Sequence, residues 1–211
     1  MGTVWAYKEG FWTKDRKTGW ADTIHMTGLA DLCDSLEHLK LRGAVPRLAI
    51  VAHGNEPGVV QLDRKLSLSS LANFAPDFAR LKPYLADKAF LEFYACIAGK
   101  DEPGSRLLVA LSQIFPGCTI VGFELYGLIG PEGSNNAPGE MDAIQNEFSL
   151  FGKTPRPQLG RLDPWCRWAK RARYGQIVHL PALEQANRKL MKCANPLCPG
   201  HREPTDSCPG W

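Results

Sequence analysis

Residues 48–54 read Leu-Ala-Ile-Val-Ala-His-Gly, and residues 90–96 read Phe-Leu-Glu-Phe-Tyr-Ala-Cys. Each stretch is a short, largely apolar run that leads to a reactive side chain, His53 in the first and Cys96 in the second. Such runs are typical of strands buried on both faces of a parallel sheet. Because ligands and chemistry collect beyond the carboxyl ends of these strands, we expect the imidazole and the thiol to lie side by side there. A thiol next to a base is a candidate nucleophile.

The sequence around these two runs alternates between helical and strand patterns. In chain order we expect a strand within 3–12, a helix at 29–39, a strand at 48–52, a hairpin arm at 59–62, a helix at 67–85, a strand at 90–95, a helix at 103–115 and a strand at 118–123. Thr27 is the expected N-cap of the first helix and Gly43 its stop signal, and Pro76 is expected to start a new turn or kink in the second. This alternation predicts an α/β fold with a largely parallel sheet.

The pattern weakens in the last third of the chain. The run 127–139 is rich in glycine, proline and asparagine, which predicts a long loop that serves either as a binding lid or as a passive connection. Outer strands are expected at 148–151 and 176–180, and a last helix at 184–192.

Composition indicates one main α/β domain at 1–190 with a small Cys/His-rich tail at 191–211. The 211 residues are 44% hydrophobic and 22% charged, which is ordinary for a globular protein. The amino terminus lacks the pattern of a signal peptide, and no apolar run approaches the ~20 residues of a membrane span. Seven unevenly placed cysteines fit a reducing compartment better than a disulfide scaffold, so we expect a cytoplasmic protein with no membrane partner.

The net charge of +3 is too small to indicate a nucleic-acid partner by itself. Residues 156–173 do concentrate six cations, which we interpret as a solvated basic helix face in preference to a site for an anionic partner. These cations are Arg156, Arg161, Arg167, Lys170, Arg171 and Arg173.

The order of a His-Gly strand, a short arm, a helix and a Tyr-Ala-Cys strand resembles the caspase-like cysteine peptidases of clan CD, and among them the bacterial CHAT and related types. The likeness covers roughly residues 29–125. It implies a caspase-like three-layer fold, with helices flanking a mostly parallel sheet, and an endopeptidase that needs no cofactor for catalysis. Cys96 would be the nucleophile and His53 the general base and acid, and the N–H groups of Gly54 and Cys96 would form the oxyanion hole. On its own, each of these side chains would more often be a buried core thiol or a hydrogen-bonding histidine.

Three acidic residues are candidates for substrate binding. Relatives that prefer a basic P1 residue commonly carry an acid next to the cysteine, and this chain offers Glu124, Asp101 and Glu102 within plausible reach. Asp101 and Glu102 are equally suited to the start of the helix that follows. Glu92 shares strand parity with Cys96 and is expected to pair internally with a cation.

The tail carries a possible metal centre formed by Cys193, Cys198, His201 and Cys208. Three thiolates and one imidazole make a complete tetrahedral zinc set, so the metal would be structural. A disulfide or a tail without metal is the alternative.

These observations predict a cysteine peptidase that acts on a protein or peptide substrate, with an activating partner a possibility. Two alternatives stay open: an inactive caspase-fold interaction module, and a nucleic-acid-binding protein built on residues 156–173 and the zinc tail.

Overall fold

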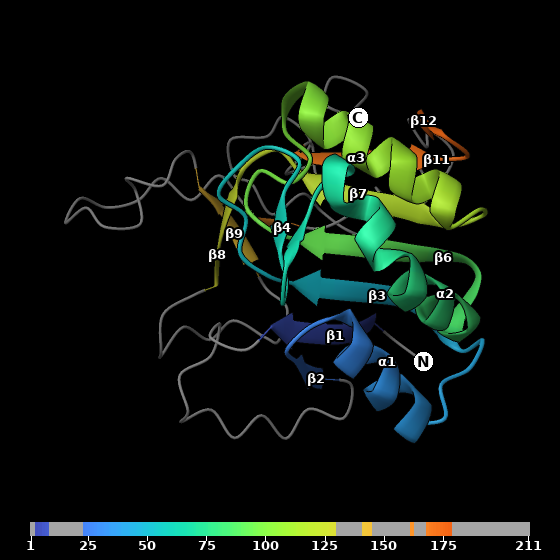
Figure 1. Cartoon of the computed structure of the whole chain (residues 1–211). Coiled ribbons are helices and arrows are strands. Elements are labelled where there is room, and N and C mark those ends of the chain that lie inside the picture. The colour runs from blue at the N-terminus through green and yellow to red at the C-terminus, as the bar shows by residue number, and fades with distance from the viewer. Residues whose placement is uncertain (1–2, 9–22, 130–140, 145–160, 163–167, 179–211) are drawn as a thin grey trace, which may run out of the picture.

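The computed structural model describes residues 3–8, 23–129, 141–144, 161–162 and 168–178. Its main feature is a seven-stranded sheet with the order β12-β11-β7-β6-β3-β1-β2 (Figure 1). The strands are β1 (Thr3–Lys8), β2 (Thr23–Met26), β3 (Val45–Val51), β6 (Leu85–Tyr94), β7 (Thr119–Phe123), β11 (Ala169–Arg173) and β12 (Gln176–Ile177). From β2 to β7 every neighbouring pair is parallel, whereas β11 and β12 add antiparallel pairs at one edge. The predicted α/β class with a mostly parallel sheet is therefore confirmed.

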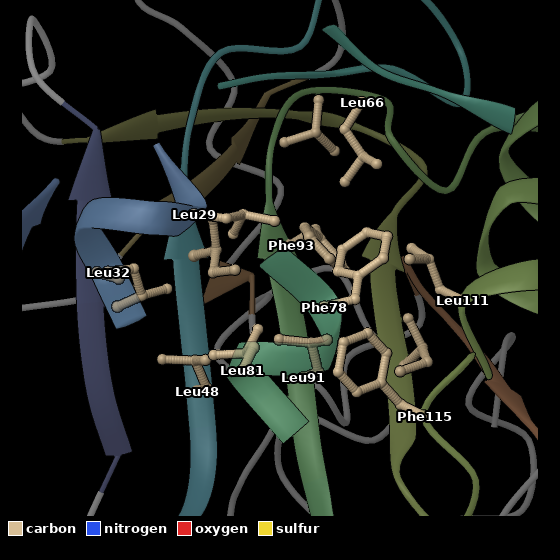
Figure 2. Packing of buried hydrophobic residues seen from close by; sticks show 14 of the residues in the cluster. Leu29, Leu32, Leu48, Leu66, Phe78, Leu81, Leu91, Phe93, Leu111 and Phe115 are labelled. Atoms are coloured by element: carbon tan, nitrogen blue, oxygen red, sulfur yellow. The ribbon is translucent and has the colours of Figure 1, made fainter. Parts of the chain in front are cut away.

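The helices of the described residues lie over one face of the sheet (Figure 1). They are α1 (Leu29–His38), the 3-10 helix η1 (Leu68–Phe74), α2 (Ala75–Leu81), the 3-10 helix η2 (Lys82–Tyr84) and α3 (Asp101–Ile114). Figure 2 shows Leu32, Phe78 and Leu111, from α1, α2 and α3, spread across the cluster that also includes Leu48 and Leu91 of the sheet. All five side chains are at most 2% exposed, and each such burial contributes about 1.5–3 kcal/mol.

The opposite face of the sheet carries a second apolar cluster, which we call the aromatic face and which contains Trp5, Tyr7, Tyr94 and Phe123. The ring centroids of Trp5 and Tyr94 are 5.0 Å apart, and those of Tyr94 and Phe123 are 4.7 Å apart. Alternation along each strand places these rings on the side opposite the helices.

The first helix begins at Leu29 as predicted, but it has a different N-cap and ends one residue earlier, at His38. Gly28, not Thr27, is the N-cap, because Thr27 instead donates from its backbone N–H to the Asp31 carboxylate at 2.8 Å. A Cβ at Gly28 would lie 2.5 Å from an oxygen of Asp63, so a side chain at this position would require the Asp63 side chain to move. The helix stops at His38, and Lys40 takes the left-handed conformation before Gly43 does.

The predicted helix at 67–85 is three shorter pieces, η1, α2 and η2, and Leu85 already belongs to β6. Pro76 lies in the first turn of α2, as its fixed φ and missing N–H favour. The strand predicted at 48–52 is β3, which begins earlier at Val45 and has an irregular register next to Pro46.

The last third of the chain holds the main corrections. Ala169–Arg173 is not part of a solvated helix face: it is strand β11, and its Arg171 is 2% exposed. The first residues of the predicted 127–139 loop belong to β8 (Tyr126–Ile129), which pairs with β9 (Met141–Ile144), and β9 pairs in turn with β10 (Arg161–Leu162). Backbone pairing across a small sheet has overridden the local turn composition there.

Other expectations fall partly or wholly outside the described residues. The strand predicted at 176–180 is present as the two residues of β12. The predicted strand at 148–151, the predicted helix at 184–192 and the tail lie outside the described residues. None of the helices that the structure describes is long and apolar enough to cross a membrane.

Candidate functional site

The register between β3 and β6 brings the two reactive residues to the same point of the sheet edge. Val51 is the Cα partner of Tyr94, and the N–H of Ala52 donates to the carbonyl of Tyr94 at 3.2 Å. Counting two residues on from Val51 and from Tyr94 leads to His53 and Cys96. Adjacent strands lie only about 4.8 Å apart, so the pairing brings the backbones of His53 and Cys96 to neighbouring positions at the carboxyl edge of the sheet.

Gly54 presses directly against the backbone of Cys96. A Cβ at Gly54 would lie 2.2 Å from the carbonyl oxygen of Cys96 and 2.9 Å from its nitrogen. A side chain cannot occupy that space, so the glycine permits the close approach of the two loops. The segment after β3 and the segment after β6 are therefore in contact at Gly54 and Cys96.

A short antiparallel arm holds the backbone of His53. The arm consists of β4 (Val60–Gln61) and β5 (Lys65–Leu66), and it confirms the hairpin arm predicted at 59–62. The N–H of Gln61 donates to the carbonyl of His53 at 2.8 Å, and the amide of Gln61 donates to the side chain of Asn55 at 2.9 Å. These bonds fix the chain on both sides of Gly54.

The imidazole of His53 lies where its neutral form is favoured. The residue as a whole is exposed, but neighbouring protein removes part of the water around the ring. This partial desolvation, followed by the charge of Lys8 at the end of β1, lowers the pKa of His53 below its usual value. A neutral imidazole is the form that accepts a proton from a thiol.

Cys96 begins a tight turn whose backbone is strained. The residue is half-buried, and the next residue, Ile97, has a φ of 51°. A β-branched residue rarely adopts the left-handed conformation, which costs about 1–3 kcal/mol and persists only where the surroundings enforce it. The N–H of Ile97 donates to the carbonyl of Leu125 at 3.0 Å, and the N–H of Gly99 donates to that of Phe123 at 2.8 Å. The chain just beyond β7 thus holds the turn in place.

The two other described cysteines are in apolar surroundings that disfavour the thiolate. Both Cys33 and Cys118 are buried in the apolar core. Burial raises the pKa of the Cys33 thiol to about 11 and raises that of Cys118 as well. Thiols in such surroundings are poor nucleophiles.

The three residues predicted to bind substrate, Glu124, Asp101 and Glu102, have different surroundings. Glu124 pairs with Lys170, whose Nζ is 2.8 Å from the carboxylate, and the same ammonium donates to the carbonyl of Asp101 at 3.4 Å. Glu124 and the Asp101 backbone therefore meet around a cation. Glu102 is on the first turn of α3, where its side chain is 82% exposed and 4.0 Å from Arg106.

Glu102 and Arg106 line a cavity of about 370 Å³ between the segment after Gly54 and the start of α3. The other lining residues are Pro57, Gly58, Val59, Ser67, Leu68, Ser69 and Pro103. A Cβ at Gly58 would lie 2.7 Å from the backbone of Pro103, so the segment after His53 rests on α3 as well as on Cys96.

Glu92 has the internal cation that its strand parity predicted. Arg47 of β3 forms two hydrogen bonds to its carboxylate, at 2.7 and 3.0 Å, and the carboxylate is fully buried on the aromatic face. The predicted zinc ligands Cys193, Cys198, His201 and Cys208 lie outside the described residues. The described residues hold no group of three or more His, Cys, Asp or Glu side chains that could bind a metal ion.

Sequence reasoning missed one residue of this region. Lys170 was counted only as one cation of a basic segment, because its partners Glu124 and Asp101 are far away in the chain. The antiparallel pairing of β11 with β7, in which Lys170 is the Cα partner of Gly122, brings it to this region. The turn between β11 and β12, with Tyr174 and Gly175 both at positive φ, has a local signal in its glycine.

Comparison with known proteins gives one match. Residues 21–121 match the model of a family described as a domain of unknown function (DUF4347). The matched segment covers slightly less than half of the chain, runs from just before β2 into β7, and includes both His53 and Cys96. No curated protein matches the chain, and no solved structure matches it. The chain is similar to this family over its central α/β core, and the family's description assigns no activity.

Proposed function

We propose that the protein is a caspase-like cysteine endopeptidase that cleaves a protein substrate with a Cys96–His53 dyad. The observation that carries this proposal is the shared register of β3 and β6, reinforced by the contact of Gly54 with the Cys96 backbone. Two parallel strands that end together at an imidazole and a thiol provide what acyl transfer by a thiol requires.

The proposed reaction has two steps. The Cys96 sulfur, its proton passed to His53, attacks the carbonyl carbon of the scissile peptide bond. The negative charge on the carbonyl oxygen is stabilised by the N–H groups of Gly54 and Cys96. The His53 imidazolium then donates its proton to the leaving amine, which departs and leaves a thioester. Water, deprotonated by His53, attacks the thioester and releases the acid and the free thiol.

Glu124 and Glu102 differ in how well they could bind a basic side chain of the substrate. Glu124 faces Lys170, and its charge is thereby largely neutralised, which argues against a role in binding a basic P1 side chain. The side chain of Glu102 is 82% exposed against 37% for that of Glu124, and Glu102 lines the cavity beside the site. We therefore assign substrate contacts first to Glu102. Lys170 is ion-paired and Arg171 is buried, so β11 does not offer the exposed basic stripe that nucleic-acid binding needs.

Selective alkylation tests the dyad and separates an enzyme from an inactive caspase-fold binding module. We expect iodoacetamide at neutral pH to label Cys96 before Cys33 and Cys118, and His53→Ala to slow the labelling of Cys96 at least tenfold. The matched control is His25→Ala, which removes an imidazole on β2. Equal labelling rates in wild type and His53→Ala would favour the binding module.

As part of this proposal the protein works in a reducing compartment, the cytoplasm, because a catalytic thiol must stay reduced. We also propose that the tail binds one structural zinc ion through Cys193, Cys198, His201 and Cys208. Elemental analysis of protein purified without added metal would then show about one zinc per chain, whereas a metal-free tail would end that part of the proposal.

A further inference from the structure

Lys170 joins three groups at the back of the turn that carries Cys96. Its ammonium lies 2.8 Å from a carboxylate oxygen of Glu124, 3.0 Å from the hydroxyl of Ser105 and 3.4 Å from the carbonyl oxygen of Asp101. The hydroxyl of Ser105 donates in turn to the same Asp101 carbonyl at 2.9 Å. One side chain of β11 thus bridges the end of β7 to the start of α3.

The two segments that Lys170 bridges both hold the Cys96 turn: the start of α3 follows the turn in the chain, and the end of β7 accepts hydrogen bonds from it. The turn begins at Cys96 and leads into α3 at Asp101, and both Ile97 and Asp101 have left-handed φ angles, 51° and 53°. On the β7 side, Phe123 and Leu125 accept the hydrogen bonds from Gly99 and Ile97. Glu124 lies between these two acceptors, and its own N–H donates to the carbonyl of Trp168 at 2.9 Å.

We propose that Lys170 is a positioning residue for Cys96, a role that rests on the proposed dyad for its catalytic meaning. By holding Glu124 and Asp101 together, the ammonium closes a loop of contacts that runs from Cys96 through Ile97, Leu125 and Glu124, then through Lys170 and Asp101 back along the chain to Cys96. A turn with two residues in a rarely adopted conformation keeps its shape only when its surroundings enforce it.

The surroundings of Lys170 suit this role. Its side chain is 19% exposed and that of Glu124 is 37% exposed, so the pair is partly shielded from water. Hydrogen bonds from a charged donor are stronger than those between neutral groups. Lys170 lies beyond the 21–121 segment that matches the family, so β11 supplies a part of the site that the matched segment does not contain.

We call the contacts of Lys170 with Glu124, Ser105 and Asp101 the clamp. Hydrogen exchange tests the clamp without relying on catalysis. In Lys170→Met, which keeps the length of the side chain but removes its donors, we expect the amides of Ile97 and Gly99 to exchange about three- to tenfold faster. The amides of Leu48 and Ile50 in β3 should be unchanged. Lys170→Arg, which keeps the charge, should restore most of the protection.

Alkylation then tests whether the clamp positions the thiol. In Lys170→Met we expect the rate of Cys96 labelling to fall in the folded protein, with Lys170→Arg close to wild type. The control is Arg80→Met, which breaks the exposed ion pair of Arg80 with Asp34 between α2 and α1 and should leave both readouts unchanged.

The outcomes separate the two proposals. Unchanged exchange at Ile97 and Gly99 in Lys170→Met would overturn the clamp. Faster exchange with unchanged Cys96 labelling would make Lys170 merely structural and overturn the positioning role. If His53→Ala does not slow the labelling in an otherwise wild-type chain, the dyad fails, and the exchange data still decide whether the clamp exists.

Discussion

At the scale of single residues, the approach of His53 and Cys96 depends on an atom that is absent, the Cβ of Gly54. The carbonyl oxygen and the nitrogen of Cys96 occupy the space next to that position, and both are backbone atoms that cannot rotate away as a side chain could. The sequence predicted Gly54 as an oxyanion donor, and the structure adds a packing reason for the glycine.

Gly54→Ala should therefore separate the two loops. We expect a loss of about 1–3 kcal/mol in the free energy of unfolding, since the backbone must shift to admit the methyl group. Cys96 labelling should slow as well. Thermal denaturation and alkylation measure the two effects. Gly43→Ala is the control for the labelling rate alone, because a Cβ there would have nothing within 4 Å, whereas the φ of 68° at Gly43 makes the substitution costly to stability. Gly54→Ala with wild-type stability and labelling would show that the contact is unimportant.

His53 should titrate at a lower pH than an ordinary histidine. Desolvation and, second, Lys8 lower its pKa, and Lys8→Met should raise that pKa toward the usual 6.5. Between the unfolded and the folded pKa the unfolded chain binds more protons, so the free energy of unfolding should fall as the pH falls through this window. NMR titration of the imidazole measures the shift, and a pKa at or above 6.5 in wild type would contradict it.

At the scale of elements, the ion pair of Arg47 and Glu92 ties β3 to β6 a short way before the site. Glu92 is fully buried, whereas the side chain of Arg47 is 30% exposed. Breaking a buried pair by removing one partner typically costs about 3–5 kcal/mol.

Arg47→Met should cost about 3 kcal/mol of stability, at the lower end of that range because of the partial exposure of Arg47. Lys65→Met, which removes an exposed pair with Glu56, should cost less than about 1 kcal/mol. Denaturant unfolding compares the two. Equal losses in both variants would mean that the burial of Glu92 adds nothing.

The elements that could be predicted from sequence are those whose buried residues form a continuous apolar run or a regular apolar stripe. β3, β6 and β7 are buried on both faces and read as apolar runs, and α1 and α3 show one apolar stripe each. β2 has only four residues and was not predicted. β11 carries three cations in five residues, and only its pairing with β7 makes it a strand.

The same distinction applies to the site. His53, Gly54 and Cys96 could be placed together because parallel strands deliver their carboxyl ends to one edge. The partners of Glu124 and Asp101 could not, because Lys170 reaches them through the fold and not through spacing. Local sequence patterns predict which residues lie at the end of a strand. Side-chain pairing between distant segments depends on the register of strands that are far apart in the chain.

At the scale of the whole molecule, the core that resembles a family of unknown function and the edge that supports its site are separate stretches of sequence. Residues 21–121 contain both members of the dyad, and β11 adds Lys170 from beyond them. The proposed positioning role of Lys170 therefore predicts that residues 21–121 alone would lack part of the support for Cys96.

The most direct test of the central claim is a cleavage profile on a peptide library, read by mass spectrometry for wild type and Cys96→Ala. Because the substitution removes a single sulfur, the thermal stability of the two proteins should be nearly the same. The account predicts new amino termini from wild type and none from Cys96→Ala. Cleavage by Cys96→Ala at the wild-type rate, or by neither folded protein, would contradict it.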